Sequence, residues 1–202
     1  MVDEIKIYRL FAEPVFKFRI KNYEQHNNSL QKYIYNLYEE DKIGVERSNI
    51  NGWHSKSFDM SDVSSPAHKF FKETREYVVE VFNLQGWKYI AEKVRMTEMW
   101  AVINKKNNLN LAHTHPNNFL SAAYYVKAPK NSGNIKFISS NSVKKERYPK
   151  LEKATEFNQS GVEIEPEEGN LLIFPSYLLH EVMKNKTDED RIVISFNIDI
   201  LR

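Results

Sequence analysis

The segment VFKFRI, residues 15–20, alternates apolar and polar positions. Phe16, Phe18 and Ile20 fall on one side, and the basic residues between them fall on the other. Successive side chains of an extended chain point to opposite faces, so this period of two predicts a β-strand. The preceding run IKIYRLF, residues 5–11, has a similar composition, and we expect a second short strand there.

Two longer segments, NNSLQKYIYNLYEE and SSPAHKFFKETREYVVEVFNLQG, repeat their apolar residues with the period of an α-helix. Asn28 or Ser29 is suited to cap the first helix, and Ser64 or Ser65 the second, which is expected to end before Gly86. The expected buried stripes are Leu30, Tyr33, Ile34, Leu37 and Tyr38 in the first helix, and Phe70, Thr74, Tyr77, Val78 and Val81 in the second.

The pattern changes at about Lys93. Seven short runs rich in β-branched and aromatic residues follow, from VRMTEMWAVI to RIVISFNIDI, and turn-forming residues separate them. This spacing is typical of an antiparallel sandwich or jelly roll and not of βαβ units. We therefore expect a single domain over 1–202, mainly β with flanking helices (α+β). A helical buttress over about 22–92 would cover one face of a jelly-roll core over about 93–202.

Composition narrows the chemistry. The 202 residues include no cysteine, which excludes disulfides, thiolate zinc sites, iron–sulfur clusters and cysteine nucleophiles. Any metal must therefore sit on His, Asp or Glu, a ligand set that suits iron, zinc or manganese. The formal net charge is +2 with scattered lysines, so a nucleic-acid partner is not expected.

The ends and the apolar runs indicate the compartment. MVDEIKIYRLF has acidic residues and no long apolar stretch, so it does not resemble a signal peptide, and no run approaches the length of a membrane span. The expected location is cytoplasmic, either in a bacterium or, if a phage encodes the chain, in the cytoplasm of its host. A membrane is not expected as a partner, and a homodimer stays open.

Six histidines are candidates for a metal site. His26 and His68 lie at helix starts and are expected to be exposed and idle, whereas His54 follows Trp53 in a loop and is a candidate substrate contact. His113 and His115 have the same parity, so on an extended segment both imidazoles face one side. On their own, two histidines at this spacing are more often incidental than ligands.

The order of residues after this pair is more specific. His180 lies 65 residues beyond His115 and follows the apolar run GNLLIFPSYLL, and Arg191 opens the last strand 11 residues later. HTHPNNFLSAAYYV, SGNIKF, EGNLLIFPSYLLHEV and RIVISFNI in this order resemble the Fe(II)/2-oxoglutarate-dependent oxygenases. More narrowly, they resemble a largely uncharacterised family of such oxygenases in bacteria and phages. The early runs LFAEPVFKF and NGWHSK also fit it.

The resemblance implies a double-stranded β-helix (jelly-roll) core, an Fe(II) ion, 2-oxoglutarate as cosubstrate, dioxygen, and an unknown substrate that is hydroxylated. His113 matches the first iron ligand and His180 the distal one. His115 stands where the superfamily has Asp or Glu. Either His115 completes a three-histidine site or a carboxylate from elsewhere is the third ligand. No catalytic residue is implied beyond the metal centre.

The resemblance also implies residues that hold 2-oxoglutarate. Arg191 matches the basic residue that pairs with the distal carboxylate. Ser195 shares its strand parity, and Tyr124 or Tyr125 is a candidate hydroxyl donor to the same carboxylate. Asn104 is a candidate contact to the C1 carboxylate of 2-oxoglutarate. The alternative, which the sequence NKKNN favours, is that Asn104 is a turn residue. The alternative role for both tyrosines is core packing.

Two other functions remain open from the sequence. One is a cupin-like three-histidine metalloenzyme that works without 2-oxoglutarate, and the other is a non-catalytic jelly-roll module. The cupin-like enzyme gives Arg191 no role, and this distinguishes it from the oxygenase hypothesis. Trp53 and Trp100 either line a substrate pocket or belong to the core. The charged segment 140–160 is either a lid or a surface loop.

Overall fold

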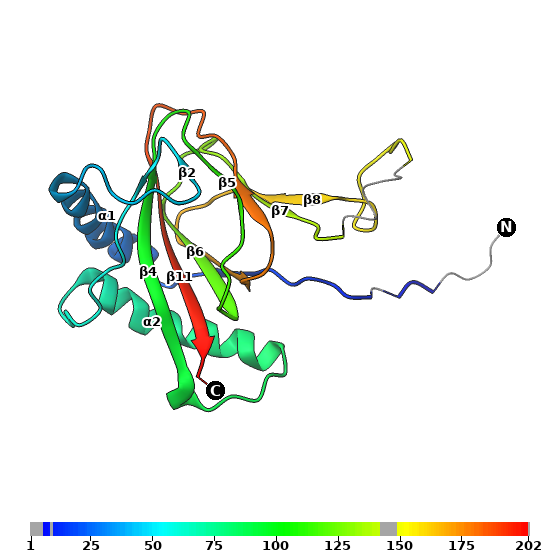
Figure 1. The fold of residues 1–202 in the computed structure, drawn as a ribbon, viewed down its shortest axis with the longest axis horizontal. Coiled ribbons are helices and arrows are strands. Elements are labelled where there is room, and N and C mark those ends of the chain that lie inside the picture. The colour runs from blue at the N-terminus through cyan, green and yellow to red at the C-terminus, as the bar shows by residue number, and fades with distance from the viewer. Residues whose placement is uncertain (1–5, 9, 142–148, 202) are drawn as a thin grey trace.

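The computed structural model describes residues 6–8, 10–141 and 149–201 of the chain, which form two β-sheets and two α-helices (Figure 1). The helices are α1 (Tyr23–Glu40) and α2 (Pro66–Leu84), with a short 3-10 turn at Ala91–Lys93. The strands are β1 (Phe16–Arg19), β2 (Asn49–Ile50), β3 (Trp53–His54), β4 (Val94–Asn104), β5 (Leu109–His113), β6 (Leu120–Lys127), β7 (Ile135–Ile138), β8 (Gly161–Ile164), β9 (Asn170–Pro175), β10 (His180–Val182) and β11 (Arg191–Ile200).

The larger sheet has the strand order β1-β9-β6-β11-β4-β3, and the smaller sheet has the order β2-β5-β10-β7-β8. The pairings in both sheets are antiparallel. Neighbours in a sheet are often distant in sequence, as expected of a jelly roll and not of βαβ units. The predicted fold class, mainly β with two helices and a jelly-roll core, is confirmed.

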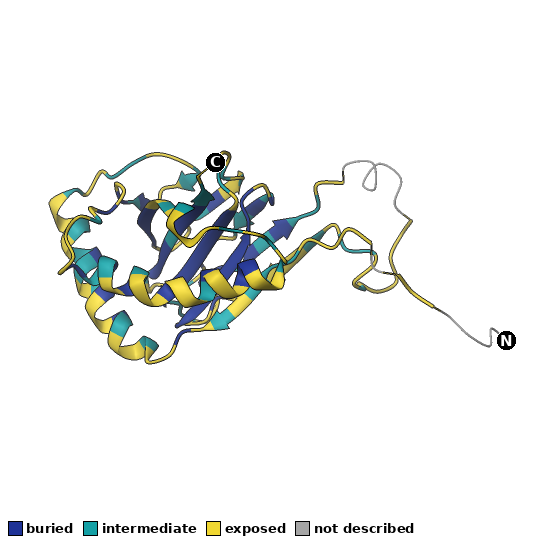
Figure 2. Ribbon diagram, turned by 90° about the horizontal axis from the view of Figure 1, so that it is seen from below, coloured by how far each residue is buried: buried dark blue, intermediate teal, exposed yellow. Residues whose placement is uncertain are grey.

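The two faces of the larger sheet have different roles. On β11, Ile192, Ile194 and Phe196 face the helices and are fully buried, whereas Arg191 and Val193 face a cavity on the other side. The sheet therefore has a helix face and a cavity face. Figure 2 shows the helices across the first of these, with their outer surfaces exposed and the strands behind them buried.

The predicted helical stripes form the contact with the sheet. Leu30 and Ile34 of α1 and Phe70 of α2 are at most 1% exposed. Phe70 packs against Tyr124 of β6 with 4.3 Å between ring centroids. Apolar burial of this kind is the main contribution to stability in a domain of this size.

The helix starts agree with the prediction in one case. Ser65 caps α2, since its Oγ accepts a hydrogen bond from the backbone N–H of His68 at 3.1 Å. The cap predicted for α1 is wrong, because α1 begins at Tyr23 after Asn22 in a left-handed conformation, with φ of 52°. Ser29 instead lies inside the helix and donates to the carbonyl of His26 at 2.9 Å.

Two other expectations need correction or limits. The described residues of the predicted strand at 5–11 have no strand structure, and they run away from the body of the molecule (Figure 1). No sheet edge supports them there, and Phe11 is 96% exposed. Of the proposed lid at 140–160, residues 142–148 lie outside the described residues. The described remainder lies beside β8, away from the cavity lining (Figure 1).

We predict that Leu30→Ala lowers the free energy of unfolding by about 2–5 kcal/mol, because it leaves a cavity where α1 packs on the sheet. Leu84→Ala is the matched control, since Leu84 is 60% exposed at the end of α2, and we expect a change within about 0.5 kcal/mol. Urea unfolding measures both variants. Equal effects would contradict the described helix packing.

Candidate metal centre and cosubstrate cavity

Three histidines come together between two strands of the smaller sheet. His113 ends β5 and His180 begins β10, and the two are direct partners in the antiparallel pairing. His115 lies two residues beyond β5, where its backbone N–H donates to the carbonyl of Ser176 at 2.9 Å. The ring centroids of His113 and His115 are each within 5.3 Å of that of His180.

These side chains could hold a metal ion. One ligand atom from each histidine lies within 4.8 Å of the other two. Over residues 6–8, 10–141 and 149–201, no aspartate or glutamate belongs to this group. The arrangement thus matches the three-histidine alternative and offers no carboxylate in place of His115.

Backbone carbonyls orient two of the three rings. Nδ1 of His113 lies 2.7 Å from the carbonyl oxygen of Leu111, and Nδ1 of His180 lies 2.8 Å from that of Leu178. A carbonyl only accepts, so each Nδ1 carries the proton and donates. The lone pair of each Nε2 is then free to bind a metal, which is the usual way in which a second hydrogen bond selects the ligating tautomer.

Burial keeps the three imidazoles neutral. It lowers the pKa of His115 to about 3, with further lowering by His180, His113 and His54. Burial, with a further contribution from the neighbouring His113, lowers the pKa of His180 to about 4, and burial also lowers the pKa of His113. Neutral imidazole is the form that binds metals, so no proton has to leave at neutral pH.

The histidines line a cavity of about 350 Å³ between the sheets. Its inner wall includes Arg191 and Tyr125, which are 2% and 3% exposed. Exposed charged side chains, among them Arg47 and Glu98, lie at its opening. A concave site with a few convergent polar groups is typical of small-molecule binding.

Arg191 is a buried cation without a counter-ion. Its Nη1 donates to the carbonyls of Ser132 at 3.2 Å and Gly133 at 2.8 Å, and its buried Nε has no hydrogen-bond partner. Among the described residues no carboxylate forms an ion pair with it. Burial lowers its pKa to about 10, opposed by Tyr125, so the guanidinium stays charged at neutral pH.

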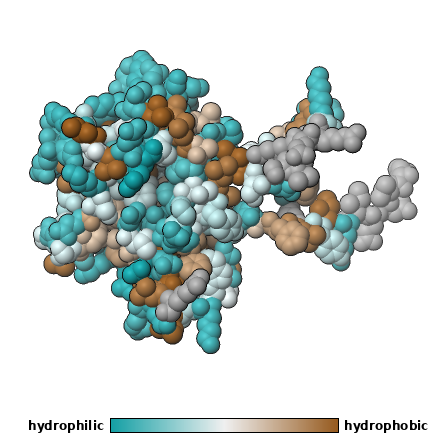
Figure 3. Space-filling model, viewed as in Figure 1, coloured by the Kyte–Doolittle hydropathy of each residue, from teal (hydrophilic) through white to brown (hydrophobic). Residues whose placement is uncertain are grey.

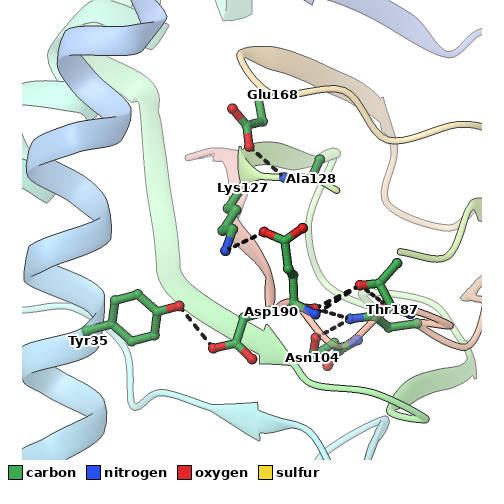
Figure 4. A network of polar contacts seen from close by, with 9 residues as sticks. Tyr35, Asn104, Lys127, Ala128, Glu168, Thr187 and Asp190 are labelled. Atoms are coloured by element: carbon green, nitrogen blue, oxygen red, sulfur yellow. Dashed lines mark hydrogen bonds and ion pairs between the residues drawn. The ribbon is translucent and has the colours of Figure 1, made fainter. Parts of the chain in front are cut away.

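The segment that leads into Arg191 is fixed at several points. Asp190 accepts a hydrogen bond from Tyr35 of α1 at 2.9 Å, and Glu189 pairs with Lys127 of β6 at 3.2 Å (Figure 4). The Asn185 amide donates to the carbonyl of Asn104 at 2.9 Å. These contacts hold the start of β11, and with it the position of the guanidinium.

The structure separates the two candidate tyrosines. Tyr125 pairs with Val193 and Tyr124 with Ile194, and directly opposed residues of antiparallel strands share a face. Tyr125 therefore lines the cavity, as does Ser195. Tyr124 faces the helices and donates to Oδ1 of Asn27 at 2.7 Å, so its candidacy for the cosubstrate site is wrong.

The structure also contradicts the role predicted for Asn104. It is the last residue of β4 and not a turn residue, and its amide donates to Oδ1 of Asn110 at 3.0 Å. It does not line the cavity, although it pairs with Arg191 in register. It holds the strand end, as its place in the network of Figure 4 indicates.

The remaining candidates divide between cavity and core. His54 and Trp100 line the cavity and stack with centroids 5.5 Å apart and planes at 10°. Trp53 lies in the helix-side core and donates to the carbonyl of Asp41 at 2.7 Å. His26 and His68 lie outside the cavity lining, but they are half-buried and not exposed as expected.

Several lining residues have no sequence motif. Arg47, Ser48 and Lys56 come from the segment around β2 and β3, which reaches the cavity only because these strands pair with β5 and β4. Glu98 could have been found, since it shares the parity of Trp100 on β4.

Comparisons with known proteins agree with this geometry. Residues 98–197 match the model of a family described as "Putative 2OG-Fe(II) oxygenase". This region is a 2OG-Fe(II) oxygenase domain. The matched part of this oxygenase runs from β4 to β11 and contains the three histidines and Arg191.

Solved structures share the fold of this oxygenase. A prolyl-4-hydroxylase from Pseudomonas putida is 13% identical, with a TM-score of 0.67 and coverage of 96% of this chain and 95% of that chain. HygX from Streptomyces hygroscopicus, with nickel and 2-oxoglutarate bound, is 11% identical, with a TM-score of 0.64 and coverage of 93% and 83%. A Trichoplax adhaerens prolyl hydroxylase, in complex with a hypoxia-inducible-factor peptide fragment, is 15% identical, with a TM-score of 0.65 and coverage of 95% and 86%.

No curated protein sequence matches the chain. Neither α1 nor α2 is long and apolar enough to cross a membrane, and the described residues include no other candidate span.

We predict that His113→Ala and His180→Ala each weaken Co(II) binding at least about 100-fold in calorimetric titration, because each removes one of three ligands. His115→Ala should do the same, whereas His115→Asp should retain tight binding through its carboxylate oxygen. His26→Gln, outside the cavity, is the control. Unchanged affinity in His115→Ala would exclude His115 as a ligand.

Proposed function

We propose that this oxygenase hydroxylates a small substrate with Fe(II) held by His113, His115 and His180 and 2-oxoglutarate held by Arg191. The observation that carries the proposal is the buried, uncompensated guanidinium in the same cavity as the three imidazoles. HygX, which has a similar fold, is described with iron, nickel and 2-oxoglutarate bound.

The charge of Arg191 favours a dianionic ligand. A buried charge without a partner is unfavourable, and a carboxylate that pairs with it removes that penalty. A guanidinium can also bind a carboxylate through two parallel hydrogen bonds, and the buried Nε of Arg191 has no partner within the protein. A dicarboxylate fits this pairing because its second end stays available to the metal.

Tyr125 is the best-placed helper of Arg191. It pairs with Val193, two residues along β11, and its hydroxyl lies close enough to Arg191 for each to influence the pKa of the other. We propose that the Tyr125 hydroxyl donates to the carboxylate bound by Arg191. Ser195 lies four residues from Arg191 on the same face, so we assign it a lesser contact.

The donor set fits Fe(II). Imidazole nitrogen is a suitable ligand for this ion, and three protein ligands leave positions open for a cosubstrate. The three histidines carry no negative charge, so the ion keeps its full attraction for the anionic cosubstrate. When bound, Fe(II) would let 2-oxoglutarate and dioxygen react with the substrate, and the products would be succinate, carbon dioxide and a hydroxylated substrate.

The chain's own residues contribute placement. The backbone bonds to His113 and His180 fix the ligating tautomers, and Arg191 fixes one end of the cosubstrate. Phe174 and Val193 provide apolar wall to the cavity and exclude water from the reaction centre. A three-histidine enzyme without 2-oxoglutarate would leave the Arg191 charge without a ligand.

We predict that Arg191→Ala abolishes the visible metal-to-ligand charge-transfer band of the anaerobic Fe(II)/2-oxoglutarate complex. The loss of a paired, charge-assisted contact should weaken 2-oxoglutarate about 100-fold. Arg191→Lys should retain part of the affinity, and it guards against a folding defect of the alanine variant. Normal 2-oxoglutarate affinity in Arg191→Ala would contradict the proposal.

The two tyrosines provide a second test. Tyr125→Phe should raise the KM for 2-oxoglutarate about fivefold to tenfold, because it removes one hydrogen bond to a charged group. Tyr124→Phe should leave that KM unchanged and lower the free energy of unfolding by about 1 kcal/mol, because it breaks the bond to Asn27. Steady-state succinate formation and urea unfolding measure these effects, and the reverse pattern would overturn the assignment.

A further inference from the structure

The opening of the cavity carries charges that the proposed iron and 2-oxoglutarate sites do not use. We call Arg47, Lys56 and Glu98 the rim charges, because all three line the cavity and are exposed. Lys56 is engaged, since its Nζ lies 2.9 Å from Oδ2 of Asp41. Arg47 and Glu98 remain as one positive and one negative group.

Arg47 and Glu98 have no ion pair with each other and no side-chain hydrogen bond within the described residues. They nevertheless line the same cavity as His54 and Trp100. The opening of the cavity thus presents one positive and one negative group that the protein does not pair with each other, and both are available to a ligand.

An aromatic wall connects the rim charges to the metal centre. Trp100 is 7% exposed, stacks on His54 and lies 5.7 Å from His115 between ring centroids. Glu98 shares the cavity face of β4 with Trp100. A molecule held at the rim with its body against Trp100 would therefore lie beside the three histidines.

The rim is separate from the proposed 2-oxoglutarate end. In the pairing of β4 with β11, Arg191 lies opposite Asn104 and Asn197 lies opposite Glu98. Six residues of strand correspond to about 20 Å. A carboxylate bound at Arg191 thus leaves Glu98 free for a second molecule, and Arg47 enters the cavity from a different segment, just before β2.

We propose that the substrate of this oxygenase is a free amino acid, a small zwitterion. Its ammonium binds Glu98, its carboxylate binds Arg47, and its carbon skeleton lies against Trp100 next to the metal. This inference rests on the proposed function. A purely anionic substrate would meet the charge of Glu98, and a purely cationic one the charge of Arg47. A substrate capped at both ends would leave both groups unpaired.

The test uses the full chain loaded anaerobically with Fe(II) and 2-oxoglutarate. The probes are the twenty protein L-amino acids, each as the free form, the N-acetyl form and the carboxamide. We expect at least one free amino acid to shift the charge-transfer band and to stimulate succinate formation in air. It should act at concentrations at least about tenfold lower than either blocked form, because each block removes one charged contact.

Two variants test the proposed contacts of Glu98 and Arg47 with the substrate. Each is used only after its charge-transfer band shows that Fe(II) and 2-oxoglutarate are bound. Glu98→Gln should abolish the preference for the free over the N-acetyl form, and Arg47→Gln should abolish the preference for the free form over the carboxamide. Lys56→Gln, the matched rim control, should keep both preferences.

Two failures are distinguishable. If the band forms and no free amino acid shifts it, or if blocked forms act equally well, the amino-acid proposal is overturned and the oxygenase proposal stands. If the band never forms, the proposed function itself fails.

Discussion

The alternation of side chains along β11 is the constraint on which both halves of the molecule depend. In its first half every second residue is buried against α1 and α2, and the residues between them, Arg191, Val193 and Ser195, form the inner wall of the cavity. A one-residue slip in register would exchange these sets and place Arg191 in an apolar core. The pairing of β11 with β4 over ten residue pairs makes such a slip unfavourable.

Electrostatics then defines what the cavity accepts. Its inner end combines a buried guanidinium with three neutral imidazoles, so the protein contributes positive charge and no negative charge there. The negative charge that balances the guanidinium and a bound metal ion must therefore come from the ligands. Placing that charge in a low-dielectric cavity strengthens each pairing and makes a missing partner correspondingly unfavourable.

The sequence supported some of these features better than others. His113, His115, His180 and Arg191 were recognisable because their order along strands of matching parity is specific. The sequence did not distinguish Tyr124 from Tyr125. The turn after His115 interrupts the strand pattern, and the strand register shifts near Val193, so parity alone does not show which tyrosine faces the cavity. The three histidines converge as the ordered motif predicts, whereas their metal and the contacts of 2-oxoglutarate stay predictions.

Other features depend on tertiary pairing. The rim residue Arg47 lies in a segment without periodicity, which enters the cavity through strands of only two residues each. The start of α1 depends on a left-handed Asn22, a conformation that sequence patterns seldom reveal. Local patterns therefore predicted the helix interiors and the long strands, while long-range contacts determined the ends and the cavity opening.

The hydrogen bonds at His113 and His180 have a consequence for how such a cavity can diversify. Both rings are oriented by the carbonyl of the residue two positions earlier, a partner that every amino acid supplies. Substitutions in the surrounding wall therefore leave the orienting group in place. The orientation of the histidines can therefore be conserved while the residues that line the cavity change. Substrate specificity can evolve without loss of the metal-binding geometry. Similar folds at 11–15% identity are in keeping with that freedom.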